Sequence, residues 1–306
     1  MSNILVTGAD GFIGTHLVKK LTSQDNNVFG CDLIHSRDIN YNRCDIAEYR
    51  QLHSLFRAHL PQIDMVFNLA GEFGRSNGNM NYEQLWKTNV IGMRNILELQ
   101  QLYNFKLIHF SSSEIYGDYR GIMKESVPLK HSLHLLNDYA ISKSVNEQQI
   151  RNAINMERQI VTVRLFNIYG PGEYYSPYRS AMAIFCYCAL KNRQFTAYMS
   201  HSRVWLYIDD LIKTLVNIPG NFKSGSIYNI GGNKTYYMDS LAELVLKYTN
   251  ASSKLLTLIE TEPLAVLHKR VDCSLAKKEL GHRPTTSIEL GIKQTLRWMK
   301  EVYGGF

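Results

Sequence analysis

A glycine-rich segment directly after the first apolar run constrains the fold of this chain more than any other feature. Residues 4–7 are apolar or β-branched, and three glycines then follow at intervals of three residues. Between a strand and a helix, such glycines permit a tight turn, close approach of the backbone to a pyrophosphate, and close helix-to-strand packing. The first turn of the helix also offers free N–H groups to phosphate. We therefore predict a dinucleotide-binding turn whose contact residues are Gly8, Gly11, Phe12, Ile13 and Gly14.

The next apolar run, residues 28–31, ends at an acid, Asp32. In dinucleotide-binding folds, a carboxylate at this place accepts hydrogen bonds from the adenosine ribose and repels a 2′-phosphate. NAD is therefore the expected cofactor. The nearby His35 and Arg37 keep NADP as the alternative.

The rest of the chain alternates short apolar runs with segments that lack proline and have helix-compatible apolar spacing, residues 12–21, 82–103 and 137–155. The apolar runs are residues 4–7, 28–31, 65–69, 107–110 and 160–166. This alternation predicts an α/β fold with a doubly wound parallel (Rossmann-type) sheet, because right-handed crossovers place helices on both faces.

After residues 170–172 the sequence changes character, with a tyrosine-rich stretch and frequent proline and glycine. We predict an NAD-binding domain over residues 1–170 and a smaller, mostly C-terminal α/β substrate-binding region over residues 171–306. Residues from about 204 to 231 are expected to return to the first domain.

Several classes of protein are excluded by simple counts. The longest apolar run, residues 181–190, is about half of the roughly 20 residues that a bilayer-spanning helix needs. The first residues lack a basic segment of the kind that begins a signal peptide, so we expect a cytoplasmic protein without a membrane span. Five cysteines without a CxxC pair indicate neither a disulfide framework nor a metal site.

The net charge of +7 favours an anionic partner, but five consecutive basic residues occur nowhere in the sequence. A basic arm for nucleic acid is therefore not expected. The charge is equally explained by a solvated surface with some arginines that face phosphate, and it does not choose among polymers, phosphates and sugar nucleotides.

The glycine spacing resembles the short-chain dehydrogenase/reductase superfamily, and three further segments resemble its motifs. Residues 44–46 match a segment beside adenine, residues 68–71 match the strand end beneath nicotinamide, and residues 87–92 match the helix behind it. The resemblance implies cofactor contacts from Asp45, Ile46, Leu69, Ala70 and Asn89. For Asp45, capping of a helix is an equal alternative.

The resemblance also implies a catalytic pair in Tyr139 and Lys143, which lie four residues apart and therefore share one helix face. A second YxxxK occurs at Tyr187 and Lys191, so the motif alone is weak. Only the first pair follows a strand-plus-serine signature, residues 110–117. We predict that the second pair only packs a helix.

Within the serine signature, Ser112 corresponds to the residue that hydrogen-bonds the reacting sugar oxygen, with Ser111 and Ser113 as neighbouring alternatives. Residues 164–171, 203–211 and 228–232 resemble the extended branch of the superfamily: nucleotide-sugar epimerases, dehydratases and decarboxylases. This resemblance implies a nucleotide-diphosphate sugar as substrate. It also implies a homodimer formed through the helix that bears Tyr139 and the segment over residues 82–103.

The same resemblance implies substrate contacts outside the serine signature. Asn167, Arg203 and Arg270 are expected to bind the diphosphate, for which a forked guanidinium is well suited. Arg270 is equally explained by a surface ion pair. Arg75 lies in a glycine-rich segment, residues 71–78, and is expected either to contact the sugar or to face solvent.

The implied reaction begins with Tyr139 as base on a sugar hydroxyl while the cofactor takes a hydride from the same carbon. Action at pH 7 needs a tyrosine pKa lowered by about three units, roughly 4 kcal/mol, and we expect the Lys143 ammonium and the cofactor to supply this. Several reactions of the resulting 4-keto sugar are possible, and epimerisation is the first choice because it needs no further acid or base.

The pair Ser113–Glu114 bears on the alternatives. Dehydratases of this branch carry Asp-Glu there, so 4,6-dehydration lacks its acid. Ser-Glu resembles uronate decarboxylases, in which Glu114 would be catalytic, and release of the ketone by a 4-dehydrogenase is a further alternative. Outside enzymes, an NAD-binding sensor or a nucleic-acid-binding protein remains as a separate class.

Overall fold

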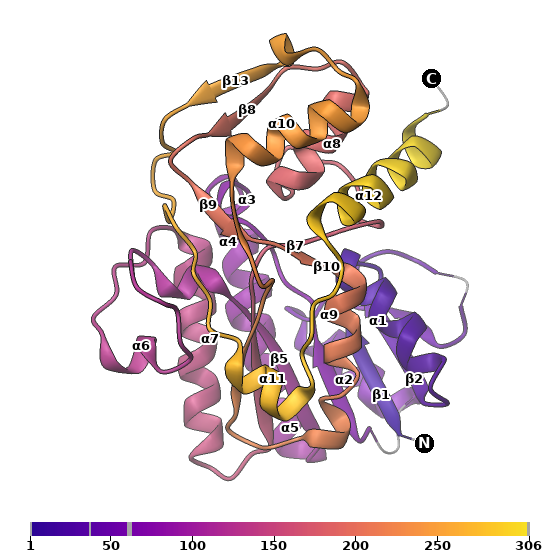
Figure 1. Ribbon diagram of the computed structural model, residues 1–306. Helices are drawn as coiled ribbons and strands as arrows, with labels where there is room; N and C mark the ends of the chain where they lie inside the picture. The colour runs from indigo at the N-terminus through magenta and orange to yellow at the C-terminus, as the bar shows by residue number, and fades with distance from the viewer. Residues whose placement is uncertain (1, 37, 60–62, 305–306) are drawn as a thin grey trace. The chain divides into compact units, whose positions relative to one another are not determined.

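The computed structural model describes residues 2–36, 38–59 and 63–304. Its main feature is a seven-stranded sheet in the order β11-β6-β5-β4-β1-β2-β3, in which strands β1 to β5 pair in parallel (Figure 1). The strands are β1 (Asn3–Thr7), β2 (Asn27–Asp32), β3 (Tyr41–Arg43), β4 (Met65–Asn68), β5 (Lys106–Ser112), β6 (Ile160–Leu165) and β11 (Ile227–Ile230). The order 3-2-1-4-5-6 is that of a doubly wound dinucleotide-binding sheet, which confirms the predicted fold class.

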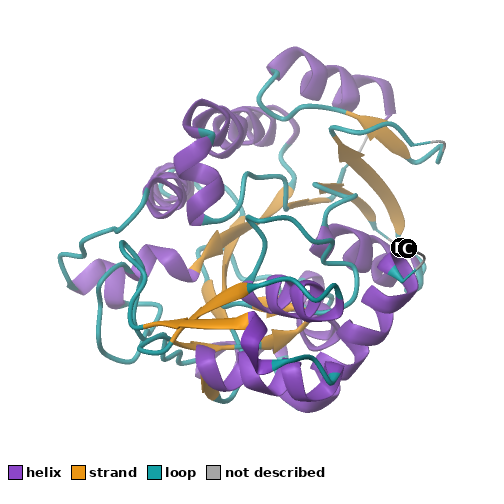
Figure 2. Cartoon of the chain, turned by 90° about the horizontal axis from the view of Figure 1, so that it is seen from above, coloured by secondary structure: helices purple, strands orange, loops and turns teal. Residues whose placement is uncertain are grey.

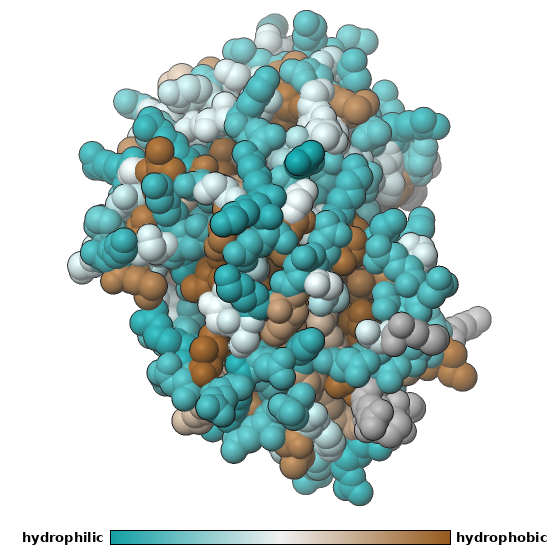
Figure 3. Space-filling view, turned by 60° about the horizontal axis from the view of Figure 1, so that its bottom comes forward, coloured by the Kyte–Doolittle hydropathy of each residue, from teal (hydrophilic) through white to brown (hydrophobic). Residues whose placement is uncertain are grey.

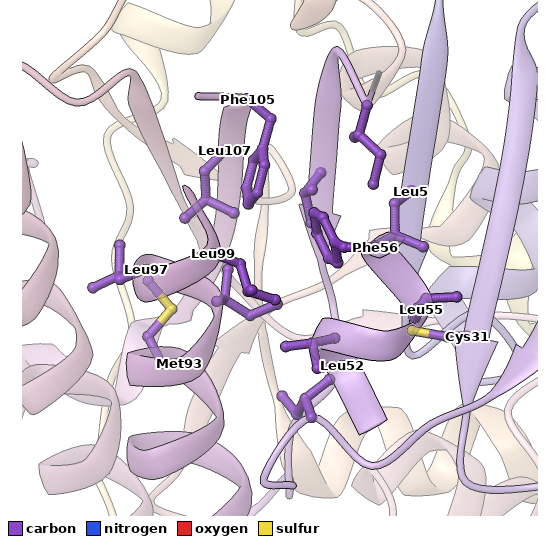
Figure 4. Packing of buried hydrophobic residues seen from close by; sticks show 14 of the residues in the cluster. Leu5, Cys31, Leu52, Leu55, Phe56, Met93, Leu97, Leu99, Phe105 and Leu107 are labelled. Carbon is purple, nitrogen blue, oxygen red and sulfur yellow. The ribbon is translucent and has the colours of Figure 1, made fainter. Parts of the chain in front are cut away.

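Helices flank this sheet in Figures 1 and 2. They are α1 (Phe12–Thr22), α2 (Tyr49–His59), α3 (Arg75–Met80), α4 (Tyr82–Trp86), the π-helix η1 (Lys87–Ile91), α5 (Gly92–Tyr103) and α7 (Asp138–Ile154). The apolar sides of α2 and α5 pack on the sheet in one buried cluster (Figure 4). In that view Leu52 and Phe56 of α2 and Leu99 of α5 lie between Leu5 and Leu107 of the strands. Burial of such side chains stabilises the fold by about 1.5–3 kcal/mol each.

The chain divides into two compact units, each built from separate stretches. Unit 1 comprises Met1–Ile115, Asn137–Arg164 and Ile212–Tyr228, and unit 2 comprises Tyr116–Leu136, Leu165–Leu211 and Asn229–Phe306. The strand β11, which begins at the end of the third stretch of unit 1, lies beside β6 in the large sheet. The assignment of a separate function to residues 1–170 and 171–306 stays a prediction.

Unit 2 contains three two-stranded sheets and several helices. The pairs are β7 (Ile168–Tyr169) with β10 (Leu206–Tyr207), β9 (Ser202–Val204) with β12 (Thr235–Tyr237), and β8 (Phe195–Tyr198) with β13 (Leu256–Ile259). Its helices are α6 (Val127–Lys130), α8 (Ala181–Leu190), α10 (Met238–Thr249), α11 (Ser274–Leu280), α12 (Ile288–Tyr303) and the short η4 (Ser253–Leu255). The remaining elements are η2 (Ser113–Tyr116), α9 (Ile208–Leu215) and η3 (Pro219–Asn221).

The second YxxxK motif lies in unit 2, on α8. The Tyr187 ring stacks on Tyr175 with 3.7 Å between ring centroids, and Lys191 Nζ donates to the backbone oxygen of Tyr303 at 2.5 Å. Both side chains therefore pack within the unit, as predicted.

The surface drawn in Figure 3 is mostly hydrophilic, with apolar side chains in small groups. Among the described residues, no helix combines the length and the hydropathy that a membrane span requires. The described residues also include no cluster of three or more histidine, cysteine or acidic side chains able to hold a metal ion.

Candidate active site

The glycine turn joins β1 to α1 in unit 1, and its backbone is packed too closely for side chains. Gly8 has φ +70°, and a Cβ added there would lie 2.7 Å from the backbone nitrogen of Ala70. A Cβ on Gly14 would lie 2.0 Å from the Gly8 oxygen. The N-cap residue of α1, Gly11, provides no side-chain cap to the helix. The turn therefore has the form of a helix N-terminus open to an anion.

Asp32 ends β2 beside this turn. Its Oδ2 accepts a hydrogen bond from the Asp10 backbone N–H at 3.0 Å, and its Oδ1 accepts from Leu33 N–H at 2.7 Å. Burial, followed by the Asp32 carboxylate, raises the pKa of Asp10. The turn and the acid predicted to hold the adenosine ribose are thus adjacent.

The cationic neighbours of Asp32 include one that the sequence did not indicate. Arg43 Nε donates to the Leu33 backbone oxygen at 3.0 Å, and its Nη1 lies 3.3 Å from His35 Nε2. Arg37, the other residue considered for a 2′-phosphate, lies outside the described residues.

Asp45 and Ile46 follow β3. Asp45 Oδ1 accepts from the backbone N–H of Ala47 at 2.9 Å, which is the local turn contact expected of a capping acid. Ile46 is 3% exposed, and a Cβ on Gly92 would lie 2.7 Å from its Cδ1. The Ile46 side chain therefore packs against the start of α5.

The end of β4 lies against the candidate catalytic helix. Ala70 N–H donates to Thr7 Oγ1 at 3.2 Å, which fixes the residue that follows Leu69 to the end of β1. A Cβ on Gly71 would lie 3.1 Å from Asn89 Oδ1 and 3.5 Å from Lys143 Nζ. The backbone of the loop after β4 therefore passes close to the Lys143 ammonium, with little room for a larger side chain at position 71.

Asn89 lies in the π-helical turn η1, where the sequence predicted one uninterrupted helix over residues 82–103. Its side chain exchanges two hydrogen bonds with the backbone of Glu72, at 2.8 and 3.0 Å, and donates to Ser142 Oγ at 3.0 Å. π-Turns of this kind occur frequently at functional sites. Asn89 therefore ties the loop after β4 to α7.

Tyr139 and Lys143 occupy the first turns of α7. Asn137 caps the helix by accepting from Ala140 N–H at 2.9 Å. Lys143 Nζ donates to the Phe110 backbone oxygen at 3.0 Å and lies 5.9 Å from the centroid of the Tyr139 ring. The two groups therefore face the same region of the β5 end.

The pKa of Tyr139 in the chain alone is dominated by burial. Burial raises it to about 12, a hydrogen bond with Ser112 lowers it, and Glu114 raises it. Burial also lowers the pKa of Lys143 to about 8, although Glu147 raises it. The lowering of the tyrosine pKa that we expect from Lys143 and the bound cofactor together stays a prediction.

The last two serines of β5, Ser111 and Ser112, point in different directions, and Ser113 begins η2. Ser112 Oγ is hydrogen-bonded with Tyr139 and accepts from the Glu114 backbone N–H at 3.2 Å. Ser111 Oγ instead donates to Glu147 at 2.6 Å, and Ser113 is 2% exposed. Asn137 Nδ2 donates to Glu114 Oε2 at 3.4 Å. Ser112 and Glu114 thus lie with Tyr139, whereas Ser111 faces away.

The other predicted substrate contacts lie mostly in unit 2. Asn167 has φ +21°, and its buried Oδ1 has no hydrogen-bond partner among the residues that the structure describes. Arg203 Nη1 donates to the backbone oxygens of Ser202 and Leu267, both at 2.9 Å. Arg270 is exposed on the same unit. In unit 1, Arg75 begins α3 and is half-buried.

Sequence reasoning missed a buried ion pair behind Lys143. Glu147 continues the 139–143 spacing by one more turn, and Arg164 opens a motif in which only Asn167 received a role. The Arg164 guanidinium binds the Glu147 carboxylate at 2.6 and 2.9 Å. The spacing of four residues between Lys143 and Glu147 was the available signal. Nothing local in the sequence indicates that Glu147 pairs with Arg164, which lies 17 residues later.

Several known proteins are similar to this chain. The sequence profile of the NAD dependent epimerase/dehydratase family matches residues 4–231. A UDP-N-acetyl-alpha-D-glucosaminuronate decarboxylase from Bacillus cytotoxicus is 26% identical over 97% of this chain and 98% of its own. A dTDP-glucose 4,6-dehydratase from Salmonella typhimurium is also 26% identical, over 96% and 92%.

A solved structure shows the same fold over nearly the full length. The UDP-glucuronic acid 4-epimerase from Bacillus cereus, in complex with UDP-glucuronic acid and NAD, has a TM-score of 0.87. It is 25% identical, and the match covers 98% of this chain and 100% of that one.

Proposed function

This chain belongs to the NAD dependent epimerase/dehydratase family, and we propose that it is a nucleotide-sugar 4-epimerase. The family match confirms the resemblance drawn from the motifs and makes the protein an enzyme of an NAD-dependent family. In the proposed reaction, the hydroxyl group at C4 of the sugar is oxidised to a ketone. The ketone is then reduced by hydride on its opposite face, which inverts the configuration at C4. The observation that carries the proposal is the placement of Tyr139 with Ser112 and the Lys143 ammonium at one strand end.

The residues of the glycine turn fit NAD. Backbone atoms already occupy the space that a Cβ would fill at Gly8 and Gly14. Only glycine therefore allows this turn to form beside a pyrophosphate. When bound, NAD accepts a hydride from the sugar carbon and later returns it. The residues that would hold it are Gly8, Gly11, Phe12, Ile13 and Gly14 at the pyrophosphate, Asp32, Asp45 and Ile46 at adenosine, and Leu69, Ala70, Asn89, Tyr139 and Lys143 at nicotinamide.

In the proposed mechanism, Tyr139 Oη takes the proton of the sugar hydroxyl while Ser112 Oγ hydrogen-bonds the same oxygen. With a pKa of about 12, ionising this phenol at pH 7 costs about 7 kcal/mol. Lys143, with a pKa of about 8, is mostly cationic at pH 7 and stabilises the phenolate as it forms. The substrate diphosphate is assigned to Asn167, Arg203 and Arg270, and the sugar to Arg75, Ser112, Ser113 and Glu114.

The choice of epimerisation depends on Ser113 and Glu114. A buried serine at 113 supplies no acid for loss of water, which disfavours 4,6-dehydration. Epimerisation needs only the groups already described. Glu114, held by Asn137 near Tyr139, favours uronate decarboxylation as the second candidate, and one relative has that activity. A 4-dehydrogenase remains a further alternative.

A screen of nucleotide sugars tests the proposal. Purified protein with NAD is incubated with UDP-, dTDP-, GDP- and CDP-linked hexoses and uronates, and products are followed by mass spectrometry and NMR. We expect unchanged mass with inverted configuration at C4. Loss of carbon dioxide would establish the decarboxylase instead, and loss of water or of two hydrogens would establish the dehydratase or dehydrogenase. Binding of RNA or DNA that nucleotide sugars do not displace would favour the non-enzymatic class.

Replacement of Asp32 by asparagine tests the cofactor assignment. Removing the carboxylate removes its repulsion of a 2′-phosphate, so the ratio of NADPH to NADH affinity is expected to rise about tenfold or more. Fluorescence titration with each reduced cofactor measures this ratio. Asp25→Asn, at an exposed left-handed position, is the matched control and should leave the ratio unchanged. An unchanged ratio in Asp32→Asn would contradict the assignment.

The homodimer is also part of the proposal. The helices that the family resemblance assigns to the interface, including η1, α5 and α7, expose Ile91, Leu102 and Ile141. Exposed apolar side chains on neighbouring helices are suited to association with a second copy.

A further inference from the structure

A buried ion pair lies directly behind the candidate catalytic lysine. Glu147 Oε1 accepts from Arg164 Nε at 2.9 Å, and its Oε2 accepts from Arg164 Nη2 at 2.6 Å. Ser111 Oγ adds a third hydrogen bond to Oε1 at 2.6 Å. The side chain of Arg164 is 1% exposed and that of Glu147 is 10% exposed. The pair therefore joins α7, β5 and β6 in an environment where charges interact strongly.

The pair is one helical turn from Lys143. Residues 143 and 147 are four apart on α7 and therefore lie on one face, and Glu147 acts electrostatically on the ammonium. Both carboxylate oxygens of Glu147 are already bound by Arg164. Lys143 instead donates to the Phe110 backbone oxygen. The lysine thus senses the Glu147 charge without sharing its hydrogen bonds.

The other groups facing Lys143 do not replace this charge. On α7 the preceding turn carries Tyr139, which is neutral because burial raises its pKa. On β5, His109 points to the same face as Ser111, because alternate residues of a strand share a face. Burial and the Lys143 ammonium hold the pKa of His109 well below its ordinary value, so this ring is neutral. Gly71 of the loop after β4 and Asn89 of η1 carry no charge.

The opposite charges of Glu147 and Arg164 act in opposite directions on the pKa of Lys143. Glu147 favours the ammonium form of Lys143, and Arg164 offsets that effect because its guanidinium lies against the same carboxylate. A lone buried carboxylate would hold the lysine proton more tightly, whereas a lone buried guanidinium would expel it. A balanced pair leaves Lys143 cationic at pH 7 with its N–H groups available to the loop after β4.

We infer that Glu147 and Arg164 are positioning residues that act through Lys143, because their buried pair anchors α7 to β5 and β6 and sets the charge presented to Tyr139. The inference depends on the proposed function only for the catalytic importance of Lys143. The electrostatic part can be measured without any substrate.

The test is an NMR titration of the lysine Cε signals in protein labelled with ¹³C-lysine, with Lys143 assigned by its loss in Lys143→Met. The wild type should titrate near 8. Glu147→Gln should lower the Lys143 pKa and Arg164→Met should raise it, each by about one unit or more. The double variant Glu147→Gln/Arg164→Met, which carries neither charge, should return toward the wild-type value.

The control is an exposed ion pair of the same chemistry on α5. Arg94 Nε lies 3.0 Å from Glu98 Oε1, and both side chains are largely exposed. Glu98→Gln and Arg94→Met therefore change the same charges and should leave Lys143 unshifted. Shifts of the same sign in Glu147→Gln and Arg164→Met, or no shift in either, would overturn the inference.

If Glu147→Gln does not fold, the titration of Arg164→Met alone decides the inference. We expect Arg164→Met to fold, because the Lys143 ammonium then serves as the counter-ion of Glu147. With the sugar identified by the screen, the basic limb of kcat/KM should move with the measured pKa in each variant. If the basic limb of kcat/KM stays at the same pH while the pKa of Lys143 changes, the link between Lys143 and turnover is refuted. Retained turnover in Tyr139→Phe would instead refute the proposed function and leave the titration result intact.

Discussion

Tyr139→Phe is expected to lower turnover by about 10³-fold while the protein stays folded and binds NADH. The substitution removes only the phenolic oxygen, and a general base contributes about 10²- to 10⁴-fold to a rate. The buried ring is retained, because phenylalanine differs from tyrosine only in the missing hydroxyl. Turnover is measured on the sugar found by the screen, with thermal unfolding and NADH titration on the same preparation.

The matched control is Tyr187→Phe, which removes the hydroxyl from the second YxxxK motif. Its ring stacks on Tyr175, and stacking does not need the oxygen. This variant should turn over at the wild-type rate. Equal activity in the two variants, with Tyr139→Phe still active, would mean that another group removes the sugar proton.

The fold was predictable because its signals are local. Residues 4–7 and the glycines after them form a strand, a turn and a helix within one continuous stretch. The helix predicted to begin at Phe12 does so, and the one predicted over residues 137–155 runs from Asp138 to Ile154. Asp32 could be placed because the end of β2 lies beside the end of β1 in a parallel sheet.

The electrostatics of the site were less predictable, because they depend on burial. The spacing of Tyr139 and Lys143 gives their proximity correctly, but spacing carries no information about desolvation. In the chain alone, burial raises the pKa of Tyr139 and lowers the pKa of Lys143. The ion pair of Glu147 and Arg164 joins a helix to a strand that follows it, and such contacts appear only after folding.

The division into two units also lay beyond local signals. The sequence places one border near residue 170 and returns residues from about 204 to 231 to the first domain, whereas each unit is assembled from three stretches. Residues 116–136 belong with unit 2, although they precede α7 in the chain. Hydrophobic periodicity identifies elements but not the set of elements with which each one packs.

Gly14→Ala is expected to be the most damaging single methyl addition in the cofactor turn. In the interior of a helix, alanine is normally preferred over glycine by about 0.5–1 kcal/mol, so propensity alone predicts stabilisation. At this position the added Cβ would lie 2.0 Å from the Gly8 oxygen and 2.9 Å from Ala9 Cα, both on the backbone. We expect destabilisation by about 3 kcal/mol, with NADH affinity reduced more than tenfold, because the turn itself must move.

Two further glycines of unit 1 extend this prediction to a rank order of three alanine variants. A Cβ on Gly11 would lie 3.2 Å from the Gly8 oxygen, and a Cβ on Gly220 would meet nothing within 4 Å. Thermal unfolding should therefore rank Gly14→Ala below Gly11→Ala, and Gly220→Ala at or slightly above the wild type, because alanine restricts the unfolded chain. NADH titration should show the same order for the two turn variants and no change for Gly220→Ala. If Gly14→Ala binds NADH as tightly as Gly220→Ala does, the pyrophosphate does not lie on this turn, since its backbone cannot accept the methyl group without moving.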